Sequence, residues 1–191
     1  KGNVVTADGL MDEIEALSQE QLITRYPELG NEEIARRAKV ISLAAIKLLL
    51  LRNDAKKVIV FDPKESVSFD GQTGPYLLYT IARCHSIVKK STKKADPELG
   101  TLLTLPREKE LLSKLAMKGG IYESTLAHYS PHILTQYLLD LANTFNSYYH
   151  EAHVMQENVS LEQARLALVE AIKDVLTDGM YLLGIETLEE M

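Results

Sequence analysis

The chain has 191 residues, 46% of them hydrophobic, so it can bury the core of one medium domain or two small ones. Its formal net charge of −6 argues against a broadly basic nucleic-acid binder, and we expect no DNA partner. A single cysteine, Cys84, excludes an internal disulfide and fits a reducing, cytoplasmic compartment. The longest apolar run, residues 40–51, is too short to span a bilayer, so no membrane partner is expected.

The first third of the chain predicts helices with one or two short strands. Residues 3–6 are mostly β-branched and are interpreted as a strand end, and residues 10–22 follow with helical periodicity. A second helix is predicted over residues 32–51, with Asn31 as its N-cap. Residues 56–62 predict another short strand between polar residues.

A helix over residues 75–90 is followed by the clearest linker, residues 91–106, which contains two prolines and a glycine. The linker separates two halves that differ in charge. Residues 1–106 contain 15 Lys and Arg against 14 Asp and Glu, whereas residues 107–191 contain 6 against 13. The positive charge therefore lies in the first half.

The acidic half predicts helices throughout. Helices are expected over residues 107–118 and 122–129, and a long one begins after Ser130 as N-cap. The last helix is expected to open with a capping box at residues 160–163 and to end at Gly184. The expected fold is thus mainly α: a helical bundle preceded by a small α-rich connecting region with one or two short strands.

The helix over residues 75–90 has two distinct faces. One face is an apolar stripe that must be core: Leu77, Ile81, Cys84 and Val88. A second stripe combines aromatic rings with positive charge: Tyr76, Tyr79, Arg83, Ser86 and Lys90. Unpaired RNA bases stack on such rings and on guanidinium planes. Periodicity alone favours the alternative, in which the tyrosines pack half-buried against the bundle and the arginine pairs with an acid.

The densest basic run of the chain follows this stripe and contains no acid: Arg83, Lys89, Lys90, Lys93 and Lys94. Such a cluster can hold a few phosphates. From charge alone, a solvated helix end whose lysines complement the helix dipole is the favoured alternative.

Histidine spacing gives no metal site. His128 and His132 are separated by a Ser-Pro pair that interrupts any helix between them, and His150 and His153 are three apart. We therefore predict no metal ligands. Cys84 lies on the apolar stripe and is expected to be a buried structural thiol.

Three stretches together resemble a known family. "SFDGQTGPYLLYTIARCHSIVKK" (residues 68–90) is similar to the segment of arginyl-tRNA synthetases written along the lines of FEGNTGPYxQYAxAR. Residues 164–191 resemble the end of their anticodon-binding domain, of the DALR type. Residues 1–14 resemble the sequence just after the KMSKS-type loop of these class I enzymes. The resemblance covers essentially the whole chain in family order.

The resemblance implies a part of an arginine–tRNA ligase, which charges tRNA-Arg with arginine using ATP and Mg²⁺. Lys1 would stand next to the KMSKS-type loop, and the catalytic domain that precedes it would be a partner of this part. The fragment itself is then expected to bind no cofactor and to have no catalytic residue. Residues 1–74 would form the connecting region and residues 75–191 the anticodon-binding domain, with residues 91–106 as its internal linker.

The resemblance also implies a binding site for the anticodon loop, whose middle base is a cytosine in most arginine tRNAs. The implied contact residues are Tyr76, Tyr79, Arg83, Lys89, Lys90, Tyr149 and Met191. Leu78 departs from the family, which commonly has Gln between the two tyrosines. Two alternatives remain: the helical anticodon-binding domain of another synthetase, and a helical protein-interaction domain that does not bind RNA.

Overall fold

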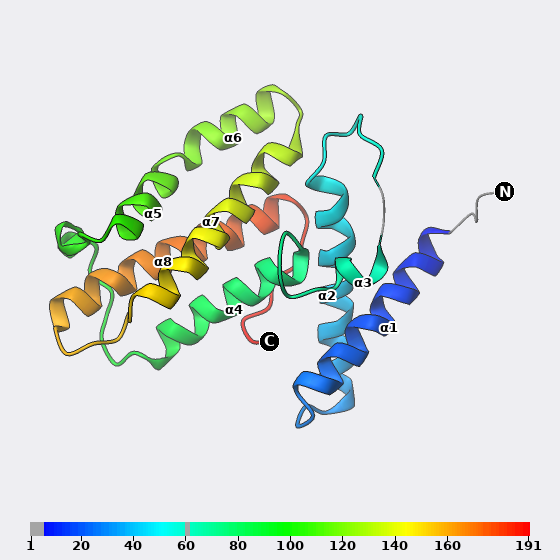
Figure 1. The fold of residues 1–191 in the computed structure, drawn as a ribbon, viewed down its shortest axis with the longest axis horizontal. Coiled ribbons are helices and arrows are strands. Elements are labelled where there is room, and N and C mark those ends of the chain that lie inside the picture. Colours follow the sequence, from blue (N-terminus) through cyan, green and yellow to red (C-terminus); the bar gives the residue numbers. More distant parts are fainter. Residues whose placement is uncertain (1–5, 60–61) are drawn as a thin grey trace.

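A computed structural model describes residues 6–59 and 62–191, which form α-helices and one 3₁₀ helix, η1 (Figure 1). The elements are α1 (Ala7–Arg25), α2 (Asn31–Leu51), α3 (Pro63–Ser66), α4 (Gly74–Lys90), η1 (Pro97–Leu102), α5 (Pro106–Ala116), α6 (Lys118–Ala127), α7 (Pro131–Glu151) and α8 (Val159–Leu182). The mainly α helical bundle predicted from the sequence is confirmed.

The predicted short strands are not found in the described residues. Val58 and Ile59, the described apolar residues of the second predicted strand, have no regular structure, and Val58 is 94% exposed. An isolated strand is not stable without a partner to accept its backbone hydrogen bonds, and none of the described segments pairs with this one. Of the other predicted strand, residues 3–5 lie outside the described residues, and Thr6 caps α1.

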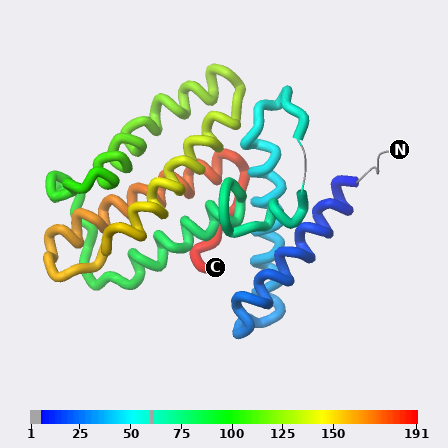
Figure 2. The backbone as a smooth tube through the Cα atoms, viewed as in Figure 1, coloured from blue at the N-terminus to red at the C-terminus, as the bar shows by residue number. Residues whose placement is uncertain are grey.

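The helices form two neighbouring groups. Helices α4 to α8 lie together as a bundle, and α1, α2 and α3 stand beside it (Figure 1). The backbone tube shows the segment after α8 returning between α4 and the α1–α2 pair (Figure 2). Lys47 of α2 donates a hydrogen bond to the carbonyl of Gly184, which anchors the start of this returning segment. No helix in the described ranges is long and apolar enough to cross a membrane.

A close backbone contact joins α4 to α2. A Cβ atom on Gly74, the first residue of α4, would lie 2.3 Å from the carbonyl carbon and oxygen of Ala44 in α2. Only glycine fits there, because backbone atoms cannot move aside as a flexible side chain can. Thr73 caps the same helix, since its Oγ1 accepts a hydrogen bond from the Tyr76 N–H at 3.2 Å. The start of α4, and with it the aromatic stripe, is therefore fixed in place.

Two predicted N-caps are wrong by one or two residues. Gly30, not Asn31, is the N-cap of α2. Asn158 caps α8, because its side chain accepts a hydrogen bond from the Leu161 N–H at 3.2 Å, so Ser160 lies inside the helix and forms no capping box. Gly184 lies at the end of α8 as predicted, with φ +69°.

A buried ion pair holds α5 against α8. Arg165 Nε lies 2.7 Å from Glu108 Oε1, and the Glu108 side chain is only 1% exposed. The second carboxylate oxygen of Glu108 accepts the Leu105 N–H at 2.9 Å, and Arg165 also donates to the carbonyl of His153 at 2.8 Å. These bonds satisfy both buried charges. They also connect α5 and α8 to the end of the segment 91–106 and to the segment after α7.

Candidate nucleic-acid interface

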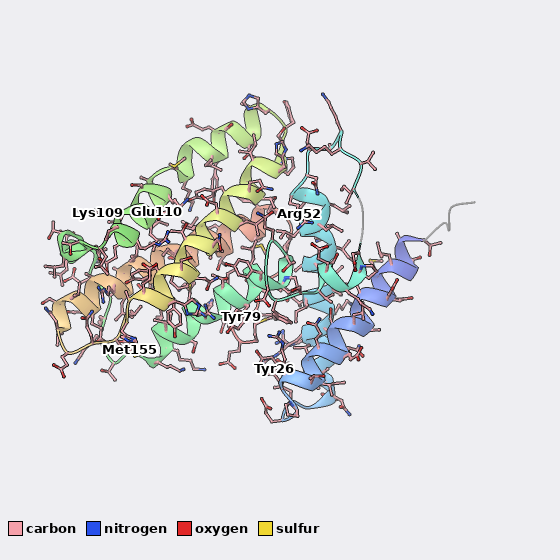
Figure 3. The ribbon with its side chains drawn as sticks, viewed as in Figure 1. Tyr26, Arg52, Tyr79, Lys109, Glu110 and Met155 are labelled. Carbon is pink, nitrogen blue, oxygen red and sulfur yellow. The ribbon has the colours of Figure 1, made fainter. Side chains whose placement is uncertain are left out.

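A hollow of about 730 Å³ lies beside α4, and we call it the α4 hollow. Residues from the end of α1, from α4, from the end of α7 and from the segment after α8 line it. In Figure 3, Tyr79 lies between Tyr26, at the end of α1, and Met155, beyond the end of α7. The hollow brings together six of the seven residues predicted as RNA contacts: Tyr79, Arg83, Lys89, Lys90, Tyr149 and Met191.

Arg83 is held between two aromatic rings in this hollow. Its guanidinium carbon lies 4.7 Å from the ring centroid of Tyr79 and 5.0 Å from that of Tyr149. One guanidinium nitrogen donates to the Tyr79 hydroxyl at 3.0 Å, and another donates to Asn146 Oδ1 at 2.5 Å. Tyr79 and Arg83 are half-buried, and Tyr149 is 38% exposed, so the group is ordered but open to a ligand.

The positive charges of the hollow differ in their partners. The hydrogen-bond acceptors of Arg83 are an amide and a phenol, and Arg83 forms no ion pair with any acid in the described ranges. Lys89, by contrast, lies 2.7 Å from Glu190 of the returning segment. This hydrogen bond raises the pKa of Lys89 and lowers that of Glu190. Glu189 and Glu190 also line the hollow, which is therefore mixed in charge.

The structure places Tyr76 outside the α4 hollow. Its ring lines a separate groove of about 680 Å³, together with Gln72 and Asn143. Its hydroxyl accepts a hydrogen bond from Asn146 Nδ2 at 2.9 Å. Tyr76 thus touches the same asparagine as Arg83 but faces another cavity, and its contact with RNA stays a prediction.

Leu78, the residue that departs from the family pattern, is fully buried in the core. It lies between the two tyrosines in sequence, yet it lines neither the α4 hollow nor the groove beside Tyr76. The leucine at this position therefore contributes to core packing and not to the lining of the hollow.

Several residues of the hollow were not predicted from the sequence. Tyr26 lies in a stretch broken by proline and glycine, where periodicity gives no information. His85 lines the hollow, and burial together with the nearby charge of Lys173 lowers its pKa. Asn146 does not line the hollow but accepts a hydrogen bond from Arg83, and it was also missed. The sequence does indicate it, because it follows Ala142 by four residues on a buried face, where a polar residue needs hydrogen-bond partners.

The described residues contain no group of three or more His, Cys, Asp or Glu side chains that could hold a metal ion. Cys84 is fully buried, and burial raises its thiol pKa to about 12. A thiol with such a pKa is protonated at neutral pH and is a poor nucleophile. The prediction of a buried structural thiol is confirmed.

Comparison with known proteins gives a consistent result. Residues 77–191 match the family described as DALR anticodon binding domain. The arginine–tRNA ligase of Methanocorpusculum labreanum is 34% identical over 190 residues, which cover 100% of this chain and 34% of that protein. The arginine–tRNA ligase of Clostridium beijerinckii is 36% identical over 191 residues, with the same coverage of each chain. The chain therefore spans about a third of the length of the curated relatives it matches.

Solved structures show the same similarity in three dimensions. Thermus thermophilus arginyl-tRNA synthetase superimposes with a TM-score of 0.91 at 30% identity, over 100% of this chain and 33% of that one. Plasmodium falciparum arginyl-tRNA synthetase superimposes with a TM-score of 0.86 at 25% identity, over 98% of this chain and 34% of that one. The arrangement of the helices is thus shared with part of these two proteins.

Proposed function

We propose, from the premise that the chain belongs to the family of DALR anticodon-binding domains, that it is the anticodon-recognising part of an arginine–tRNA ligase. Its own ligand would be the anticodon loop of tRNA-Arg. The parent enzyme would charge this tRNA with arginine in the cytoplasm, using ATP and Mg²⁺ bound by a catalytic domain outside this chain. Residues 1–74 would connect that domain to an anticodon-binding domain over residues 75–191.

The α4 hollow is the proposed contact surface. The observation that supports this most strongly is the Arg83 guanidinium, which lies between the rings of Tyr79 and Tyr149 and pairs with no acid among the residues that the structure describes. Unstacked bases bind on aromatic rings and on guanidinium planes, and the remaining guanidinium N–H groups can donate to a base or a phosphate. The exposed Lys90 lies about two turns after Arg83 on α4 and would contact the RNA backbone.

Filter-binding titrations with tRNA-Arg at two salt concentrations test the proposal. We expect binding that weakens steeply with salt, and Arg83→Ala should reduce affinity by about 1–3 kcal/mol. Lys109→Ala is the matched control, because it removes an exposed positive charge from α5, on another side of the bundle (Figure 3). Affinity unchanged by Arg83→Ala would reject the role of the hollow.

The same titrations separate the alternatives. A protein-interaction domain would bind no tRNA at either salt concentration. The anticodon-binding domain of another synthetase would prefer a different tRNA, so a non-cognate tRNA belongs in each series. A preference for tRNA-Arg over that competitor is the expected result.

A further inference from the structure

Asn146 of α7 links three side chains of α4 through one amide group. Its Oδ1 accepts from Arg83 at 2.5 Å, and its Nδ2 donates to the Tyr76 hydroxyl and to Thr80 Oγ1, both at 2.9 Å. Asn146 is only 9% exposed. A buried amide with all three partners on one neighbouring helix is a fixed part of that helix contact.

The hydrogen bonds of Thr80 determine which way the amide points. The Thr80 hydroxyl donates to the backbone carbonyl of Tyr76 at 2.8 Å, so its oxygen is left to accept. The amide nitrogen of Asn146 must therefore face Thr80, because the amide oxygen could not donate there. The amide oxygen is then directed to Arg83.

We propose that Asn146 is a positioning residue that holds the Arg83 guanidinium between Tyr79 and Tyr149 while leaving its charge unneutralised. The inference rests on the proposed function of the α4 hollow. An amide oxygen fixes a guanidinium by accepting its hydrogen bond, yet it carries no charge. A carboxylate in this position would fix the guanidinium equally well and would compete with the phosphates and base oxygens of RNA.

The order of Arg83 lowers the entropy lost on binding. A mobile arginine side chain loses conformational entropy when it binds RNA, and this loss weakens binding. A guanidinium that is already ordered in the folded protein has lost most of that entropy before it binds. Two of its hydrogen bonds go to Asn146 and Tyr79, and a guanidinium has five N–H donors, so donors remain for a ligand.

A double-mutant cycle in tRNA-Arg binding tests the coupling between Asn146 and Arg83. Asn146→Ala should weaken binding by about threefold or more, and adding it to Arg83→Ala should cause less than a twofold further loss. Asn143→Ala is the matched control, because it removes an exposed amide one turn earlier on α7 that contacts Tyr76 and not Arg83. Its affinity should stay within twofold of wild type.

A purely structural role of Asn146 would give additive losses in this cycle and would overturn the inference. If Arg83→Ala itself has no effect, the proposed function fails instead. If Arg83→Ala weakens binding and Asn146→Ala acts additively, only the positioning role fails. The two outcomes are therefore distinguishable in one series.

The guanidinium signals of Arg83 in ¹⁵N NMR give a second readout that needs no RNA. Slow rotation of the guanidinium should resolve its terminal nitrogens in the wild type, and Arg83→Ala identifies the signals by their loss. In Asn146→Ala the guanidinium should rotate faster, so the signals of its terminal nitrogens should average. In Asn146→Asp these signals should stay resolved, but tRNA binding should weaken about as much as in Arg83→Ala. Wild-type affinity of Asn146→Asp would overturn the inference, even if Asn146→Ala does not fold.

Discussion

Lys89 Nζ lies 2.7 Å from Glu190 Oε1, which joins the end of α4 to the segment that returns from α8. Both side chains are mostly exposed and both residues line the α4 hollow, so this carboxylate competes with RNA phosphates for the lysine. We predict that Glu190→Gln raises affinity for tRNA-Arg by up to about fivefold, because exposed ion pairs contribute at most about 1 kcal/mol. Filter binding measures the change.

The control for this prediction is Glu123→Gln on α6, which alters net charge equally at another exposed position. It should change affinity by much less than Glu190→Gln. Equal effects of the two variants would mean that only the total charge of the chain matters. The local competition for Lys89 would then be rejected.

Gly74→Ala should destabilise the protein, because its new methyl group would collide with the backbone of Ala44. Overpacking of this kind costs about 1–3 kcal/mol, and thermal unfolding followed by circular dichroism measures the loss. Gly120→Ala is the matched control, since a Cβ there meets nothing within 4 Å inside α6. That variant should be as stable as the wild type or up to about 1 kcal/mol more stable.

Glu108→Gln should lower the free energy of unfolding by about 3–5 kcal/mol, because it leaves the buried Arg165 guanidinium without its counter-charge. Urea unfolding gives this difference. Glu110→Gln, two residues further on, removes partly exposed pairs with Arg107 and Lys114 and should cost less than about 1 kcal/mol. Similar losses in the two variants would contradict the importance that we assign to burial.

The stability of α2 should depend on pH through Glu33. Hydrogen bonds from Arg36 and then Arg37 lower its pKa to about 2, against 4.5 for an unperturbed glutamate. A carboxyl group with a lowered folded-state pKa stabilises the protein above pH 4.5, and its contribution is lost as pH falls towards 2. The melting temperature of Glu33→Gln should therefore lie below that of the wild type at pH 7, with a gap that closes between pH 4.5 and 2.

The neighbouring Glu32→Gln serves as the control, because no ion pair of Glu32 occurs among the described residues. Its melting temperature should follow that of the wild type over the whole pH range. A gap for Glu33→Gln that stays constant with pH would show that the two arginines do not act through the charge of Glu33.

Most helices could be predicted from the sequence because their hydrogen bonds are local. The apolar stripe of α4 repeats at helical spacing, and its residues Leu77, Ile81 and Cys84 are fully buried as predicted, whereas the aromatic stripe divides between two cavities. Helix starts were less predictable, since Asn158 and Ser160 are both good capping residues and the chain context selects between them. Of the strand expected over residues 56–62, the described residues 56–59 form none, because strand formation depends on a partner that the segment itself does not encode.

The sequence by itself determined that Tyr79 and Arg83 lie one turn apart on α4, since a four-residue spacing fixes their neighbourhood in any helix. Only the tertiary structure decided what surrounds them. Tyr149 and Asn146 come from α7 and Glu190 from the segment after α8, while Tyr76 faces a different groove. These relationships depend on how helices pack against one another, which is set by the whole core and not by the periodicity of one segment.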